Sequence, residues 1–167
     1  MVSGSSGEER DVLSDALAQE LLGARLIANL ATVNPNGTVH LVPLWFIWRS
    51  PHVLLPTNHA TRKIRNLERD PRATIMIDDS RGGFDLRGLT LLGEAAIDRG
   101  ADAAATNRKI HLKYLTEEGR QLAAVDRYLA TDDVTIRFLP RRVSNWDLRN
   151  TPQGEAIRES DGGHPLG

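Results

Sequence analysis

The stretch that decides the fold is HATRKIRNLERD, His59–Asp70, which directly follows the apolar run LLPTN at residues 54–58. This pattern predicts a strand, a tight turn and a short helix whose first turn carries Thr61, Arg62 and Lys63. The first N–H groups of a helix lack intrahelical partners, and the helix dipole adds positive charge there. With a hydroxyl and two cations in that turn, the stretch predicts an anion site suited to a phosphate. The alternative is a solvated basic helix face.

The composition narrows the classes of protein to consider. The 167 residues fit one domain with a sizeable core. The 21 Lys and Arg residues nearly balance the 22 Asp and Glu residues, which argues against a nucleic-acid-binding domain. The chain has no Cys, which excludes disulfides, thiolate metal sites and cysteine nucleophiles. No apolar run approaches the ~20 residues that span a bilayer and no signal peptide opens the chain, so we expect a cytoplasmic protein that does not bind membranes.

The two ends of the chain differ in composition from its centre. Residues 1–10 and 150–167 are rich in small, polar, Gly and Pro residues and show no hydrophobic periodicity. Such segments bury little apolar surface, so we expect them to be disordered. The folded domain is therefore expected over residues 11–149.

The central part of the chain is predicted to be mainly β. Residues 25–33 and 38–48 are expected to form a hairpin around the turn NPNG, Asn34–Gly37. Both faces of the return strand are apolar, so we expect both to be covered, and Pro43 marks a bulge, an edge or an opening because it cannot donate to a sheet. Six strands with turn-like connections and peripheral helices indicate a small antiparallel barrel. The other strands are expected over 53–58, 73–79, 86–98 and 133–140, with 141–149 as a seventh strand or an extended arm, and the helices over 11–23, 59–69, 101–115 and 120–129.

Three runs carry a resemblance to a known family: ATVNPNGTVHLVPLWFIW at 31–48, LLPTNHATRKIRNLERDPRATIMIDD at 54–79, and LLGEAAI at 91–97. Together they resemble the pyridoxamine 5'-phosphate oxidase-like split barrel, the superfamily of flavin and deazaflavin oxidoreductases. The most specific piece is the pattern K-x-R-N-L-x-R-D-P-R-A from Lys63 to Ala73. SNWDLR at 144–149 is similar to the family's closing strand. It lacks the Trp-to-Arg-Leu-Ala-Pro ending, which argues against pyridoxamine phosphate as the substrate.

The resemblance implies a six-stranded antiparallel split β-barrel that forms a homodimer with cofactor sites at the subunit interface. It implies that Thr61, Arg62 and Lys63 bind the cofactor phosphate, in the turn already predicted as an anion site. The residues implied to surround the cofactor ring lie on two strands, with a further residue reaching over from the other subunit; they are Val42, Pro43, Leu44 and Trp45, then Leu55, Thr57 and Asn58, and finally Trp146. For Trp45 and Trp48, core packing is the alternative.

The cofactor itself performs the chemistry in this family, so we expect an FMN-dependent oxidoreductase acting on a small conjugated molecule, with no catalytic side chain. The five His residues lack metal-ligand spacing, so no metal site is expected. His40 either touches the ligand or is a core or rim histidine. The deazaflavin F420 is the alternative cofactor, and its longer anionic tail needs a further basic groove. Arg65, Arg69 and Arg72 are candidates for that groove; for Arg65 and Arg69 the alternative is a helix-surface residue that pairs with Glu68 or Asp70.

Two other classes of function remain open. A non-catalytic flavin- or haem-binding sequestration protein on the same barrel would hold its ligand without turnover. A small nucleic-acid-binding barrel would use the face from Arg62 to Arg72, against which the net charge argues. We expect dimerisation in any case, because an open strand pair with apolar residues on both faces needs a partner to cover it.

Overall fold

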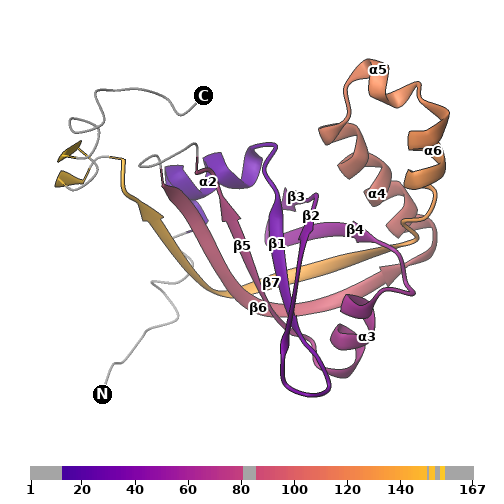
Figure 1. Cartoon of the computed structure of the whole chain (residues 1–167), viewed down its shortest axis with the longest axis horizontal. Helices are drawn as coiled ribbons and strands as arrows, with labels where there is room; N and C mark the ends of the chain where they lie inside the picture. The colour runs from indigo at the N-terminus through magenta and orange to yellow at the C-terminus, as the bar shows by residue number, and fades with distance from the viewer. Residues whose placement is uncertain (1–12, 81–85, 150, 153–154, 157–167) are drawn as a thin grey trace.

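The computed structural model describes residues 13–80, 86–149, 151–152 and 155–156. Its centre is one antiparallel seven-stranded sheet in the order β2-β1-β5-β6-β7-β4-β3, strongly curved as Figure 1 shows. This mainly β architecture confirms the predicted fold class. Residues 1–10 and most of 150–167, where disorder was predicted, lie outside the described residues. The strands are β1 (Ala28–Val33), β2 (Val39–Leu44), β3 (Ile47–Arg49), β4 (His52–Thr57), β5 (Arg72–Asp78), β6 (Arg87–Arg99) and β7 (Val134–Asp147).

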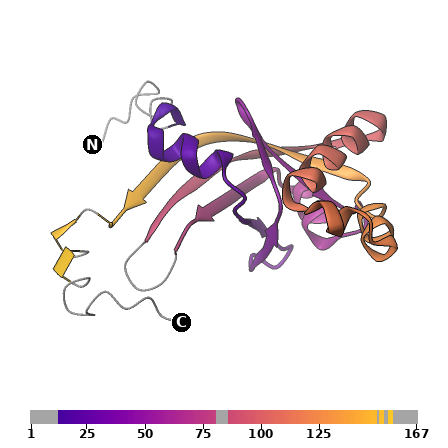
Figure 2. The same cartoon turned by 90° about the horizontal axis from the view of Figure 1, so that it is seen from above.

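The helices lie around the sheet. A group of three, α4 (Gly100–Tyr114), α5 (Glu117–Arg120) and α6 (Ala123–Leu129), connects β6 to β7 at the end of the molecule away from α2 (Figures 1 and 2). The remaining two are α2 (Ala16–Gly23) and α3 (Arg62–Arg69), so helices are present wherever the sequence predicted them, with shifted ends. None of the helices in the described ranges has both the length and the hydropathy needed to cross a membrane.

The return strand predicted over 38–48 is divided into β2 and β3 at Trp45–Phe46. The strand is interrupted there because the backbone of Phe46 bonds a side chain outside the sheet. The Phe46 N–H donates to the Tyr114 hydroxyl at 3.3 Å, and the Phe46 carbonyl oxygen lies 3.1 Å from that same hydroxyl. β2 is an edge strand, which is one of the positions where Pro43 is tolerated. The predicted sixth strand and the uncertain segment after it form a single continuous strand, β7.

The expectation that both faces of the return strand are covered is wrong within one protomer. Val39 and Leu41 of β2 are 65% and 60% exposed, and Leu92 of β6 is 42% exposed. The pairing register aligns Leu41, Ala31, Thr74 and Leu92 in one row across the sheet. We call this the outer face. It is a continuous apolar strip on the surface of the protomer.

The opposite face of the sheet encloses the core. Leu21 and Leu22 of α2 and Ile64 of α3 are buried against the strands. Gly93 lies at a shift of register between β6 and β7: a Cβ there would be 2.1 Å from the Leu139 carbonyl oxygen. Only a glycine leaves room for this close backbone approach. The largest fully buried side chains of the strands and their connections are Leu30, Phe46, Leu55, Ile75, Ile77, Leu89, Leu91 and Phe138.

Candidate functional site

A cavity of about 540 Å³ lies where β2 and β4 meet the start of α3 and the segment before β7. We call it the Lys63 cavity. Its lining combines apolar side chains with hydroxyl, amide and charged groups. Its lining residues are Ile27, Val42, Pro43, Leu44, Trp45, Pro56, Thr57, Asn58, Thr61, Lys63, Thr131 and Asp132.

Most of the predicted site residues line this cavity, and three do not. Leu55 is completely buried in the core. Arg62 is exposed and lines a different cleft on α3. Trp146 lies over Gly88, close to the end of β7, whereas Thr57 pairs with Val134 at the start of that strand. The role of each as a cofactor ligand stays a prediction. The predicted residues that the cavity brings together are Val42, Pro43, Leu44, Trp45, Thr57, Asn58, Thr61 and Lys63.

Lys63 is the residue that distinguishes this cavity. Its side chain is only 9% exposed, and no hydrogen bond or ion pair joins it to the described part of the chain. Burial lowers the pKa of Lys63 below its ordinary value, and the Asp132 carboxylate partly opposes this effect. No buried side-chain nitrogen or oxygen of the described residues lacks a hydrogen-bond partner, so the unpartnered Lys63 ammonium reaches open space, and the cavity that Lys63 lines is where it can meet an anionic ligand. The solvated-face alternative fits the exposed Arg62 and Arg65 but not Lys63.

The turn that starts α3 is held by Asn58. Its side-chain oxygen accepts the Ala60 N–H at 2.8 Å, and its amide donates to the Thr131 carbonyl at 2.7 Å. The Thr61 hydroxyl donates to the Asn58 carbonyl at 2.9 Å and makes no cap of its own on the helix. The first turn of α3 contains no acidic residue. Its free N–H groups therefore add to the positive field of Lys63.

The apolar wall is built on Trp45, whose ring stacks on Tyr114 of α4 with centroids 5.0 Å apart and planes 2° from parallel. Burial raises the pKa of Tyr114 to about 12, so its hydroxyl keeps its proton. That hydroxyl is 2.6 Å from the Leu26 carbonyl. It also bonds the N–H and the carbonyl of Phe46, at the break between β2 and β3. The contact holds the Trp45 ring, which lines the cavity, in place.

The sequence analysis missed the segment before β7. Thr131 and Asp132 line the cavity, and the Asp132 carboxylate lies 3.1 Å from the His111 ring of α4. Two carboxylates before a strand are a weak signal in the sequence. Their place beside Lys63 depends on the pairing of β4 with β7, which no local pattern predicts.

A second space, the basic cleft, lies on the other side of α3 against the hairpin turn and has a volume of about 580 Å³. Arg65 donates to the Ala60 carbonyl at 2.7 Å, and Arg69 donates to the Val33 carbonyl. Neither Arg65 nor Arg69 forms an ion pair with a described residue, whereas Arg72 pairs with Asp70 at 2.7 Å. The lining residues, none of them acidic, are Asn34, Pro35, Asn36, Thr38, Arg62, Arg65, Asn66 and Arg69.

His40 stands close to both of these spaces without lining either. It is half-buried on β2, and its pKa is lowered by burial and then by the charges of Arg62 and Lys63. This environment agrees with the rim alternative for His40. No cluster of three or more His, Asp or Glu side chains in the described ranges is arranged to hold a metal ion.

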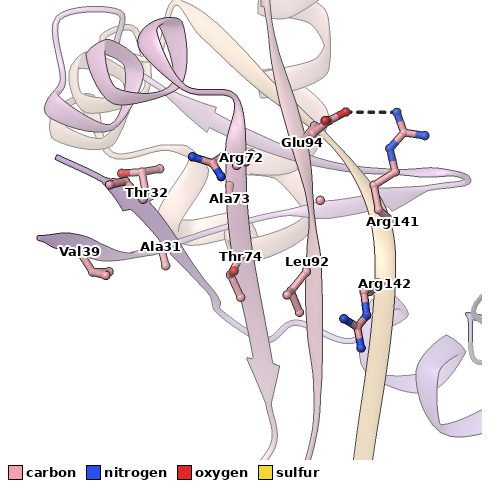
Figure 3. A pocket seen from close by; sticks show the side chains of 12 residues that line it. Ala31, Thr32, Val39, Arg72, Ala73, Thr74, Leu92, Glu94, Arg141 and Arg142 are labelled. Carbon is pink, nitrogen blue, oxygen red and sulfur yellow. Dashed lines mark hydrogen bonds and ion pairs between the residues drawn. The ribbon is translucent and has the colours of Figure 1, made fainter. Parts of the chain in front are cut away.

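A third hollow, of about 460 Å³, lies on the outer face of the sheet. Figure 3 shows its apolar floor of Ala31, Val39 and Leu92 beside the ion pair of Arg141 with Glu94, which are 3.2 Å apart. The charged groups stand at its margin and the floor is flat sheet surface. This arrangement is typical of a protein contact surface rather than of a small-molecule site.

The comparison with known proteins agrees with this geometry. The sequence model for pyridoxamine 5'-phosphate oxidase matches residues 14–147, most of the chain. The chain belongs to the pyridoxamine 5'-phosphate oxidase family. Membership confirms the resemblance drawn from the three sequence runs. No curated protein sequence matches the chain.

Solved structures extend the comparison beyond the family. The conserved hypothetical protein Rv2991 from Mycobacterium tuberculosis is 25% identical, with a TM-score of 0.64 over 89% of this chain and 88% of that one. An F420 reductase is 26% identical, with a TM-score of 0.60 over 75% of this chain and 94% of that one. HutZ, described as a heme storage protein from Vibrio cholerae, is 20% identical, with a TM-score of 0.56 over 77% and 90% of the two chains, a level that shows the fold alone.

Proposed function

We propose that the protein is an oxidoreductase that binds a phosphate-bearing flavin or deazaflavin in the Lys63 cavity and acts on a small conjugated molecule. One observation carries the proposal: Lys63, only 9% exposed and without a hydrogen bond or ion pair to a described residue, lines the same cavity as Trp45, whose ring is stacked on Tyr114. A phosphate supplies the missing partner and a planar ring fits the aromatic wall.

The residues present fit such a cofactor. Lys63, the Thr61 hydroxyl and the N-terminus of α3 would hold the phosphate. The ring would lie against Trp45, beside the edge strand β2, whose main chain at Val42–Leu44 lines the cavity. When bound, the cofactor supplies hydride or electron transfer, while the chain binds it, orients it and keeps water from its ring. No described side chain in the cavity is assigned an acid, base or nucleophile role.

Between the two cofactors, the basic cleft favours F420 over FMN. FMN ends in one phosphate, which the Lys63 cavity can accommodate alone. F420 continues beyond its phosphate into a longer anionic tail, and Arg62, Arg65 and Arg69 would offer that tail three cations. The proximity of His40 to both Arg62 and Lys63 indicates that the cleft and the cavity are neighbours. The 26% identity to an F420 reductase supports the same choice.

The test is a parallel fluorescence titration of cofactor-free protein with F420 and with FMN. We expect tight stoichiometric binding of F420, weakened in the double variant Arg65→Met/Arg69→Met, while FMN affinity stays within about twofold in that variant. Binding of FMN alone would overturn the choice of F420. Failure of both cofactors to bind would overturn the oxidoreductase proposal, and binding without any turnover of candidate substrates would support a sequestration role instead.

We also propose that the protein forms a homodimer through the outer face. Val39, Leu41, Met76 and Leu92 are large apolar side chains exposed on neighbouring strands of one sheet face, a type of surface that a second copy of the chain would cover. Leu41→Glu should shift the protein to monomer in sedimentation velocity, because a charge would be buried in the contact. Lys109→Glu, at an exposed position of α4, is the matched control and should leave the mass unchanged.

A further inference from the structure

We propose that Asp132 is a specificity-determining residue of the Lys63 cavity, whose carboxylate accepts a hydrogen bond from a hydroxyl of the polyol chain that joins the ring of a flavin or deazaflavin to its phosphate. The inference rests on the proposed function. It adds a contact to the polyol chain to those already proposed for the phosphate at Lys63 and for the ring at Trp45. It concerns a side chain that neither the sequence motifs nor the family resemblance singled out.

Asp132 is held firmly from two sides. On the side of α4, its carboxylate oxygen Oδ2 lies 3.1 Å from His111, a ring only 6% exposed, and its carbonyl accepts the Asn107 amide at 3.0 Å. On the side of the α3 turn, the flanking Thr131 and Asp133 are bound by Asn58 at 2.7 Å and by the His59 N–H at 2.8 Å. A side chain fixed in this way can recognise a ligand without first having to be ordered.

The charges of the cavity favour a neutral donor at Asp132. Among the lining residues Asp132 alone is acidic and Lys63 alone is basic. The carboxylate raises the pKa of Lys63 against the effect of burial, so the two charges influence one another, yet no ion pair within 4.0 Å joins them in the described residues. Space for a ligand therefore separates them. A phosphate close to Asp132 would be repelled, so the phosphate belongs at Lys63 and an uncharged hydroxyl at Asp132.

Asp132 is also the acceptor best placed to be used. The Asn58 side chain is occupied by Ala60 and Thr131, and the Thr61 hydroxyl donates to the Asn58 carbonyl. Of the two Asp132 oxygens, only Oδ2 has a partner among the described residues. The polyol chain carries several hydroxyl donors next to the phosphate. Oδ1 can therefore bind one of them while Oδ2 stays with His111.

The experiment separates the parts of the ligand by using three flavins that differ stepwise. FMN has ring, polyol chain and phosphate; riboflavin lacks the phosphate; lumiflavin lacks both phosphate and chain. Affinities are measured by fluorescence for wild type, Asp132→Asn and the matched control Asp102→Asn. The control removes the same charge from an exposed position of α4 that does not line the cavity. F420 and its phosphate-free deazaflavin core are measured alongside.

We expect Asp132→Asn to weaken riboflavin, or the phosphate-free deazaflavin core, by about tenfold or more, which is the size of one charge-assisted hydrogen bond. Lumiflavin affinity should not change, and Asp102→Asn should change none of the affinities. For FMN the loss should be smaller, because the variant also relieves repulsion of the phosphate.

Equal weakening of riboflavin and lumiflavin, or of neither, would overturn the assignment of Asp132 to the polyol chain. Wild-type protein that binds none of these molecules would overturn the proposed function along with it. Wild-type binding combined with an unaffected Asp132→Asn variant would overturn the inference alone. Circular dichroism and thermal unfolding of each variant confirm that the fold is intact before affinities are compared.

Discussion

Replacing Lys63 by methionine tests the site most directly, because it should change ligand binding and stability in opposite directions. Methionine keeps the length of the side chain and removes the ammonium. In wild type the burial of that ammonium lowers its pKa, which means that folding disfavours the charged form. Methionine at this position removes the charge whose burial is unfavourable. The ligand-free Lys63→Met variant should therefore be more stable than wild type.

The effect on binding follows from the missing partner of Lys63. A charge-assisted hydrogen bond contributes about 1.5–3 kcal/mol, so the variant should bind FMN and F420 about 10- to 150-fold more weakly. Riboflavin, which has no phosphate to meet the ammonium, should bind as it does to wild type. The gain in stability and the loss in affinity thus have one cause, a charge placed for a ligand rather than for the fold.

The assay combines fluorescence titration with urea unfolding of the ligand-free protein. Lys109→Met, which removes the same group from an exposed position of α4, is the matched control and should change neither quantity. An unchanged FMN affinity in Lys63→Met would mean that the phosphate binds elsewhere. A less stable Lys63→Met variant would mean that the ammonium has a stabilising partner in the folded protein, and either result would refute the reasoning.

Three further predictions concern the fold around the site. Gly93→Ala should destabilise the protein by about 1–3 kcal/mol or more in thermal unfolding, because its Cβ would overlap the Leu139 carbonyl, whereas Gly23→Ala, with no atom within 4 Å, should not. Tyr114→Phe should lower the urea midpoint by an amount equal to about 1–3 kcal/mol, because the Leu26 carbonyl loses its hydroxyl partner. Burial lowers the pKa of Lys113 from 10.5 to about 8, so between these two pH values the unfolded chain binds more protons than the folded chain. The free energy of unfolding should therefore rise with pH in this range. Lys113→Met should flatten that rise in unfolding curves recorded at several pH values.

Local patterns in the sequence were sufficient for most of the strands, the helices and the turn that starts α3. The hairpin around Asn34–Gly37 and the start of α3 depend on neighbours within a few residues, so turn residues and periodicity predict them. The division of the return strand at Phe46 could not be predicted in this way. It depends on the hydroxyl of Tyr114, 68 residues further along the chain.

The candidate site also contains residues that local sequence predicts and residues that only long-range contacts place. Thr61 and Lys63 could be named from the charge and capping pattern of one short stretch. Asp132 could not, because it reaches the cavity through the pairing of β4 with β7 and through His111 on a separate helix. Arg62 shows the limit of reasoning from neighbours: it follows Thr61 and precedes Lys63, yet the helical turn directs it to the basic cleft.

The strand order has a consequence for how the chain acquires its site during synthesis. β7 is the last strand made, yet it is inserted between β6 and β4 and joins the two parts of the sheet. Until β7 has left the ribosome, β3 and β4 have no partner that links them to the other strands, and the Thr131–Asp132 wall is missing. A nascent chain that ends before residue 134 therefore holds most of the ligand-facing residues without a closed cavity. The cavity can therefore close only after β7 has paired with β4, and the half-built sheet with its open edges is the stage at which the chain is most exposed to aggregation.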